Sequence, residues 1–151
     1  MKYRLLNLEE LADFQDEFVN FLVVHGIDAA EWVSIKKEDL AKAQHFIEVF
    51  SDFIFDGIVA QVAYLEYHDT HGIKLFKCDD DIIHLINIEC ENPDQSMEGW
   101  ESTIGHTDSP FNYFEASKSY QPDRSTEIWR MISAGAHITQ GEIFEKMALN
   151  E

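Results

Sequence analysis

The chain has 151 residues, of which 29 are acidic and 11 are basic, so its formal net charge is −18. The acidic residues are spread along the whole chain, and they would repel both a nucleic-acid backbone and an anionic membrane surface. Hydrophobic residues make up 45% and aromatic residues 13%, which is more than a disordered acidic chain contains. These values predict one folded domain over residues 1–151 that binds neither nucleic acid directly nor a membrane.

Residues 1–61 show the apolar spacing of helices. A capping-box pattern begins at Asn7, and apolar residues then follow at three- and four-residue steps until Gly26, which predicts one continuous first helix. A short helix should follow it. A third helix is predicted over about residues 39–61 and should be the central one, because apolar side chains cover more than half of its circumference. Gly57 is the position at which this helix could bend or break.

Residues 62–91 change to the two-residue alternation of strands. Short polar turns separate the runs, so the strands should form an antiparallel meander rather than a parallel sheet. Both faces of this meander carry apolar side chains, so helices should cover one face, and the later chain or a second copy of the protein should cover the other. The predicted strands are residues 62–68, 73–78 and 82–89.

Residues 92–124 contain several turn-forming Gly and Pro residues together with many aromatic side chains. They predict an irregular aromatic segment, in which Phe111–Ser117 could add a fourth strand. Helical patterns resume over 125–151, with a second C-terminal helix whose capping box should begin at Thr139. The expected fold class is therefore α+β: N-terminal helices, a three-stranded antiparallel meander, the irregular aromatic segment and two C-terminal helices.

Five short stretches carry a resemblance to a family of small acidic proteins from Bacteroidetes-type bacteria, which is a domain of unknown function. Phe55 stands where that family has Trp, a departure that concerns packing only. The resemblance implies a bacterial cytoplasmic protein with the same helix–meander–helix order, and it supplies no catalytic residue. The stretches that resemble the family are residues 1–5, 50–52, 64–66, 75–78 and 135–144.

Two histidines flank a predicted turn. His68 and His71 enclose Asp69, and Glu66 lies two residues earlier, so imidazoles and a carboxylate could together bind a divalent cation. The same pattern is typical of an exposed polar hairpin. Because the sequence identifies no third ligand from elsewhere in the chain, we assign no metal site and predict no cofactor.

His84 alternates in phase with Ile82 and Ile86, so its side chain should face inward. There it could be a hydrogen-bonded core histidine, which is the favoured interpretation, or a tuned acid or base. The acidic run Asp79–Asp81 lacks the glycine and the distal glutamate of a calcium loop. It therefore predicts a solvated turn.

The two cysteines show neither metal nor redox spacing. Cys78 and Cys90 should lie at opposite ends of the predicted hairpin, roughly 25 Å apart at about 3.3 Å per residue, so we predict no disulfide between them. The neighbouring aspartates disfavour a Cys78 thiolate. Hydrolase, P-loop and dinucleotide-binding motifs are absent from the sequence, so no catalytic residue is assigned.

The sequence favours a non-catalytic, acidic, cytoplasmic protein-interaction module. Its partner would be another protein or a second copy of the chain, which would make a homodimer. One alternative is a metal-binding protein or small hydrolase that uses His68, His71 or His84 with nearby carboxylates. Another alternative is a charge mimic of nucleic acid. The candidate partner-binding residues are the aromatic side chains Trp100, Phe111, Tyr113 and Phe114.

Overall fold

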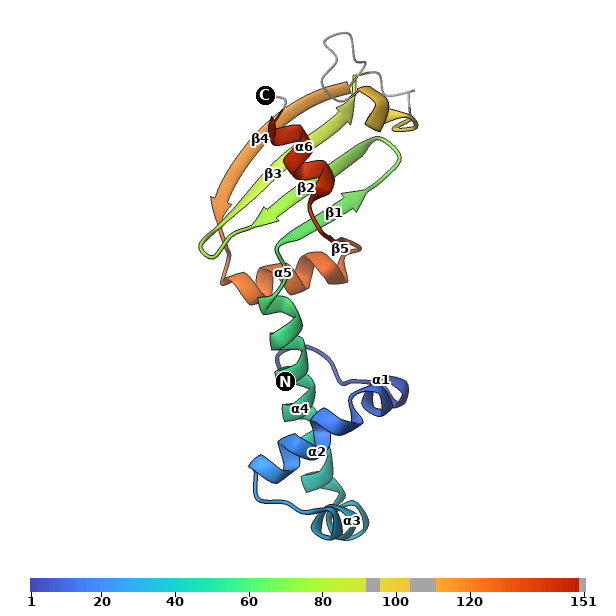
Figure 1. Ribbon diagram of the computed structural model, residues 1–151, viewed down its shortest axis with the longest axis vertical. Coiled ribbons are helices and arrows are strands. Elements are labelled where there is room, and N and C mark those ends of the chain that lie inside the picture. Colours follow the sequence, from blue (N-terminus) through green and yellow to red (C-terminus); the bar gives the residue numbers. More distant parts are fainter. Residues whose placement is uncertain (92–95, 104–110, 150–151) are drawn as a thin grey trace. The chain divides into compact units, whose positions relative to one another are not determined.

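The computed structural model describes residues 1–91, 96–103 and 111–149 (Figure 1). The chain forms two compact units, residues 1–58 and 59–151. The first unit is helical, and the second contains a five-stranded antiparallel sheet with helices. The α+β class is thereby confirmed, while the number of strands and the layout of the helices differ in detail from the prediction.

The helices of the N-terminal part are α1 (Leu8–Asp13), α2 (Gln15–Val24), α3 (Ala29–Glu38) and α4 (Leu40–Ala60). The capping box at Asn7 is confirmed, because its side chain accepts from the Glu10 amide and the Glu10 carboxylate accepts from the Asn7 amide. The prediction of one continuous first helix is wrong. Phe14, with φ −101° and ψ 24°, ends α1 and precedes α2, so the apolar spacing continues across a break in the backbone. Gly57 lies inside α4 without interrupting it.

Aromatic side chains form the core of the first unit. Phe50 is fully buried, and its ring lies 4.8 Å from that of Phe18 and 5.3 Å from that of Phe21, measured between centroids. Trp32 of α3 meets Phe18 edge to face at 5.1 Å. These rings join α2, α3 and α4 through contacts that favour tilted and edge-on geometry.

Each pair of neighbouring strands in the sheet is antiparallel, and the order is β4-β3-β2-β1-β5. The central meander was predicted correctly. Two further strands extend it. The possible fourth strand at Phe111–Ser117 is present as β4, so the irregular assignment of residues 92–124 is wrong there and at the 3-10 helix η1 (Trp100–Thr103), while residues 92–95 and 104–110 lie outside the described part. The strands are β1 (Tyr64–His68), β2 (Gly72–Cys78), β3 (Ile82–Cys90), β4 (Phe111–Ser119) and β5 (His137–Thr139).

The two C-terminal helices are α5 (Arg124–Ser133) and α6 (Glu142–Leu149). The second begins at Glu142, two residues later than a capping box at Thr139 predicts, because Thr139 belongs to β5 and its hydroxyl accepts from the Gly141 amide at 3.2 Å. Gly141 has φ +79°, and a β-carbon there would lie 2.5 Å from the Tyr64 ring. A glycine is therefore required for the close approach of α6 to β1.

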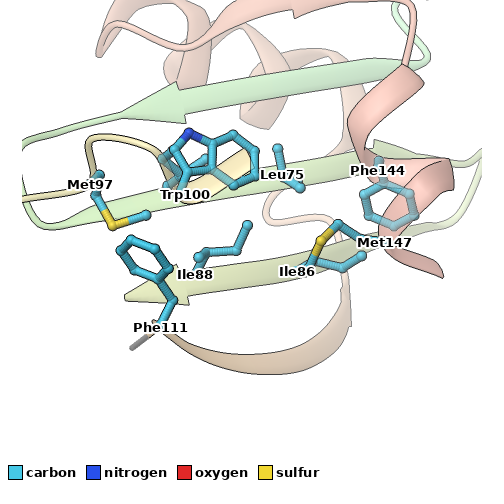
Figure 2. Close-up of a cluster of buried hydrophobic side chains, with 9 residues drawn as sticks. Leu75, Ile86, Ile88, Met97, Trp100, Phe111, Phe144 and Met147 are labelled. Carbon is cyan, nitrogen blue, oxygen red and sulfur yellow. The ribbon is translucent and has the colours of Figure 1, made fainter. Parts of the chain in front are cut away.

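One face of the sheet is covered by α6 and η1, and its buried side chains are drawn in Figure 2. Tyr64 at the edge of this cluster donates to Glu145 of α6 at 2.6 Å, and Lys77 lies 3.0 Å from the same carboxylate. These contacts lower the pKa of Glu145 and tie α6 to the sheet. The cluster consists of Ile73, Leu75, Ile86, Ile88, Met97, Trp100, Phe111, Phe144 and Met147.

A second polar contact region lies at the start of α5, around Arg124. Its guanidinium donates to backbone carbonyls in two stretches of the second unit, residues 59–62 and 78–79. Because each of these carbonyls gains a charged donor, the arginine ties the chain segments together through their backbone groups. The acceptors are the carbonyl oxygens of Val59, Val62, Cys78 and Asp79.

Both cysteines are free, as predicted. Burial raises the pKa of the Cys78 thiol to about 11, with the Arg124 charge acting in the opposite direction. Tyr120, next to it, donates to the Asp79 carbonyl at 2.6 Å, and burial raises the pKa of its hydroxyl to about 12. Cys78 is therefore a protonated core side chain rather than an activated nucleophile.

The helices were also compared with the requirements of a membrane span. Within the described ranges, no single helix combines the length and apolar character that a span needs. The pair of α2 and α3 meets the requirement only when both helices, bent by 93° at their junction, are counted together.

Candidate functional site

Two neighbouring strands bring three metal-ligating side chains together at one edge of the described sheet. Strand alternation places Glu66 and His68 of β1 on the same face. The register of β1 with the three-residue strand β5 pairs Glu66 directly with His137, so the second imidazole lies beside the same carboxylate. We call Glu66, His68 and His137 the β1–β5 cluster.

The donor atoms of the β1–β5 cluster all lie within 4.8 Å of one another. His68 Nε2 is 2.9 Å from Glu66 Oε1, and the rings of His68 and His137 are stacked with centroids 5.2 Å apart and planes 24° apart. Two imidazole nitrogens and one carboxylate oxygen form a ligand set that zinc and non-haem iron sites use, and it leaves coordination positions open.

The two kinds of ligand in the cluster differ in exposure. Glu66 is buried, at 9% of its full exposure, whereas the side chain of His68 remains 39% exposed. A carboxylate in such a position costs free energy unless polar partners compensate for its lost hydration. Here the carboxylate lies beside two histidines that are both exposed at the surface, so an incoming ion could reach it without unfolding the sheet.

A cavity of about 550 Å³ adjoins the β1–β5 cluster, because His68 is a member of the cluster and also lines the cavity. Trp100 of η1 forms another part of its wall, with its ring 6.5 Å from that of His68. Met97 is apolar, while Glu98 and Glu101 add negative charge. An ion held by the cluster would thus face a space large enough for water and a small ligand.

Of the hairpin residues that the sequence grouped as possible ligands, the structure brings Glu66 and His68 together but not the other two. Asp69 is a turn residue, since its carboxylate accepts from the backbone amides of His71 and Gly72 at 2.8 and 2.7 Å. His71 is not a member of the β1–β5 cluster. His137 was missed because strand pairing, rather than proximity in the sequence, brings it to Glu66.

The interpretation of His84 as a core residue is wrong. Its side chain is 37% exposed and contacts polar groups on both sides, with Nε2 2.9 Å from Asp79 Oδ2 and Nδ1 2.8 Å from Ser117 Oγ. The alternation correctly placed His84 on the same face as Ile86. However, the buried cluster does not extend to this end of β3, where Ile82 is also exposed.

The four aromatic residues named as candidate partner-binding side chains fall into two groups. Trp100 and Phe111 are 6% and 5% exposed and belong to the core in Figure 2. Tyr113 and Phe114 are 38% and 49% exposed, and strand alternation directs them to opposite faces of β4. A role for these residues in binding a partner stays a prediction.

The whole chain was compared with known protein families, curated proteins and solved structures. A family model described as "Family of unknown function (DUF6495)" matches residues 1–150. No curated protein matches the chain. No solved structure matches it either.

Proposed function

Because the chain belongs to the DUF6495 family, which has no assigned function, we propose a function on the strength of the site alone: the protein binds a divalent transition-metal ion, best matched by Zn²⁺, through Glu66, His68 and His137. The observation that carries this proposal is that three donor atoms from the paired strands β1 and β5 lie within 4.8 Å of one another on the same face of the sheet. Neutral imidazole and carboxylate are ligands that zinc prefers in proteins.

The backbone supports this proposal because it orients the ligands before any ion arrives. Two of the three donors are borne by one strand at a two-residue spacing, and the third is borne by the strand directly paired with it. A site on paired strands loses little conformational freedom on binding, which favours affinity. The net charge of −18 also raises the local concentration of cations near the surface.

Three protein ligands leave a fourth position for water, as in zinc sites that remain reactive rather than purely structural. The adjoining cavity of about 550 Å³ offers room for that water and for a further ligand. Zn²⁺ in such a position would polarise an oxygen of the bound molecule or lower the pKa of its water. This makes metal binding the primary function and metal-assisted hydrolysis the chemistry within its reach.

The test is a zinc titration of the metal-free protein by isothermal calorimetry, together with the visible spectrum of the Co²⁺ form. We expect one ion per chain and a tetrahedral Co²⁺ spectrum. Glu66→Gln and His137→Ala should each weaken zinc binding by at least about 10- to 100-fold.

His71→Ala is the matched control, because it removes a histidine from the same hairpin that is not a member of the cluster. The proposal fails if the wild-type protein binds no zinc at micromolar concentration. It also fails if His71→Ala weakens binding as much as His137→Ala does.

A further inference from the structure

We propose that Ser117 is an activated nucleophile, with His84 as its general base and Asp79 as the group that orients His84, and that it accepts short acyl groups from uncharged esters. This site lies on the same face of the sheet as the β1–β5 cluster but shares no residue with it. The proposal does not depend on metal binding.

The hydrogen bonds run in one continuous chain. Ser117 Oγ lies 2.8 Å from Nδ1 of His84, and Nε2 of the same ring lies 2.9 Å from Asp79 Oδ2. A carboxylate only accepts, so Nε2 carries the proton and Nδ1 is left to accept the proton of the serine hydroxyl. The three groups thus have the roles of an acid–base–nucleophile relay, with the two ring nitrogens exchanged relative to the Ser-His-Asp triad of serine proteases.

The sheet register builds this arrangement. His84 of β3 pairs directly with Ser117 of β4, and Lys77 of β2 pairs with His84 on its other side. Asp79 directly follows β2, and its amide donates to the Ile82 carbonyl to close the tight turn into β3. The carboxylate therefore returns to His84 through a short loop, and regular strands hold the other groups in place.

The relay opens on a cavity of about 260 Å³. Its walls include the apolar residues Ile86 and Phe144 and the charged residues Lys77 and Glu115. That volume suits a small acyl group. Because the chain is strongly acidic, an uncharged ester would enter more readily than an anion.

The reaction balances without a cofactor. Ser117 Oγ attacks the ester carbonyl carbon as its proton passes to His84 Nδ1, and the resulting imidazolium is stabilised by the Asp79 carboxylate. Collapse of the tetrahedral intermediate breaks the bond to the alcohol oxygen, which leaves with the proton from Nδ1. Water then attacks the acyl-serine with the same base, which releases the carboxylic acid and restores Ser117.

Edge strands leave alternate N–H groups outside the ladder, and such groups can donate to an oxyanion. β4 is an edge strand of the described sheet. Alternation from the Asp79–Ile82 bond directs the His84 backbone to β2, so the amide of its partner Ser117 faces away from β3 and offers such a donor at the nucleophile itself.

The test is labelling of the intact protein with an alkyl fluorophosphonate, in the presence of a chelator, followed by mass spectrometry and peptide mapping. We expect a single adduct at Ser117, formed with loss of fluoride. Ser117→Ala should abolish it, and His84→Gln should slow labelling by at least about 100-fold. Hydrolysis of p-nitrophenyl acetate should fall in the same order.

Ser119→Ala is the matched control, because Ser119 lies two residues further along the same strand and on the same face. It should label at the wild-type rate, and because labelling is done in chelator the result is independent of the metal site. The proposal is overturned if no adduct forms, if the adduct maps to another residue, or if His84→Gln leaves the rate unchanged. Mapping in the wild-type protein decides the question even if Ser117→Ala fails to fold.

Discussion

Two polar regions of the second unit use their hydrogen-bonding groups in opposite ways. At the start of α5, the Arg124 guanidinium donates to backbone carbonyls, and the neighbouring Tyr120 hydroxyl does the same. In the β1–β5 cluster, side chains face other side chains across two strands. Around Arg124 the polar groups are used to bond the backbone. In the β1–β5 cluster the side chains form a group that could bind a ligand. The Arg124 contacts are therefore structural, and the β1–β5 cluster is the candidate binding site.

The largest expected effect concerns Arg124. Arg124→Gln should lower the free energy of unfolding by about 3 kcal/mol, because several carbonyls lose a charged donor at once. Urea denaturation would measure this change. Arg130→Gln, an exposed position in the same helix, should change stability by no more than about 0.5 kcal/mol. Equal losses in the two variants would contradict a structural role for the Arg124 contacts.

The next largest effect is expected in the β1–β5 cluster, when zinc binds. Zinc at about 100 times its dissociation constant should stabilise the wild-type protein by about 2.7 kcal/mol, because the ion binds only the folded arrangement of ligands. Thermal unfolding with and without zinc would measure the gain. His137→Ala should remove it, while His71→Ala should retain it. A gain that survives in His137→Ala would mean that zinc binds elsewhere.

A smaller effect is expected on the pH dependence of stability in the region around Arg124, where Cys78 lies. Burial raises the pKa of the Cys78 thiol from 9.0 to about 11, so the unfolded thiol ionises first as the pH rises. The stabilising contribution is fully present below pH 9 and is lost as the pH approaches 11, amounting to a loss of about 1 kcal/mol between pH 8 and 10. Urea denaturation at the two pH values would measure it. Cys78→Ala should show a correspondingly shallower pH dependence, and an identical slope would contradict the assignment.

The smallest effect on the free energy of unfolding is expected for Glu66, to which we assign a role in binding rather than in stability. In the absence of metal, Glu66→Gln should change the free energy of unfolding by no more than about 0.5 kcal/mol, because an amide oxygen can still accept from His68. Chemical denaturation in chelator would measure it. A loss above about 2 kcal/mol would instead make Glu66 a structural residue comparable to Arg124.

The local signals in the sequence predicted the elements that repeat a pattern over many residues. The central meander and the helix over residues 40–60 follow from such patterns. The break at Phe14 does not, because apolar residues keep helical spacing on both sides of it. Strand β5 is three residues long and is defined by pairing with a strand about seventy residues earlier, so no local pattern identifies it.

In the candidate sites, too, the sequence predicted the groupings of neighbouring residues but not those made by strand pairing. Glu66 and His68 are two residues apart, and their grouping was visible in the sequence. His137 and Ser117 join their partners only through the registers of β5 with β1 and of β4 with β3. Sequence alternation indicated the correct face for His84, but it does not report how far the buried cluster extends along that face, and the cluster does not include His84.

Strand β5 has a further consequence for how the protein behaves in solution. It covers the outer side of β1 with only three residue pairs. Without it, β1 would present a row of unpaired amides and carbonyls, which is the template on which strands of other chains add and aggregates grow. An ion bound between His137 and the two β1 ligands would hold this cover in place. Metal supply would then control the colloidal stability of the protein as well as the occupancy of its site.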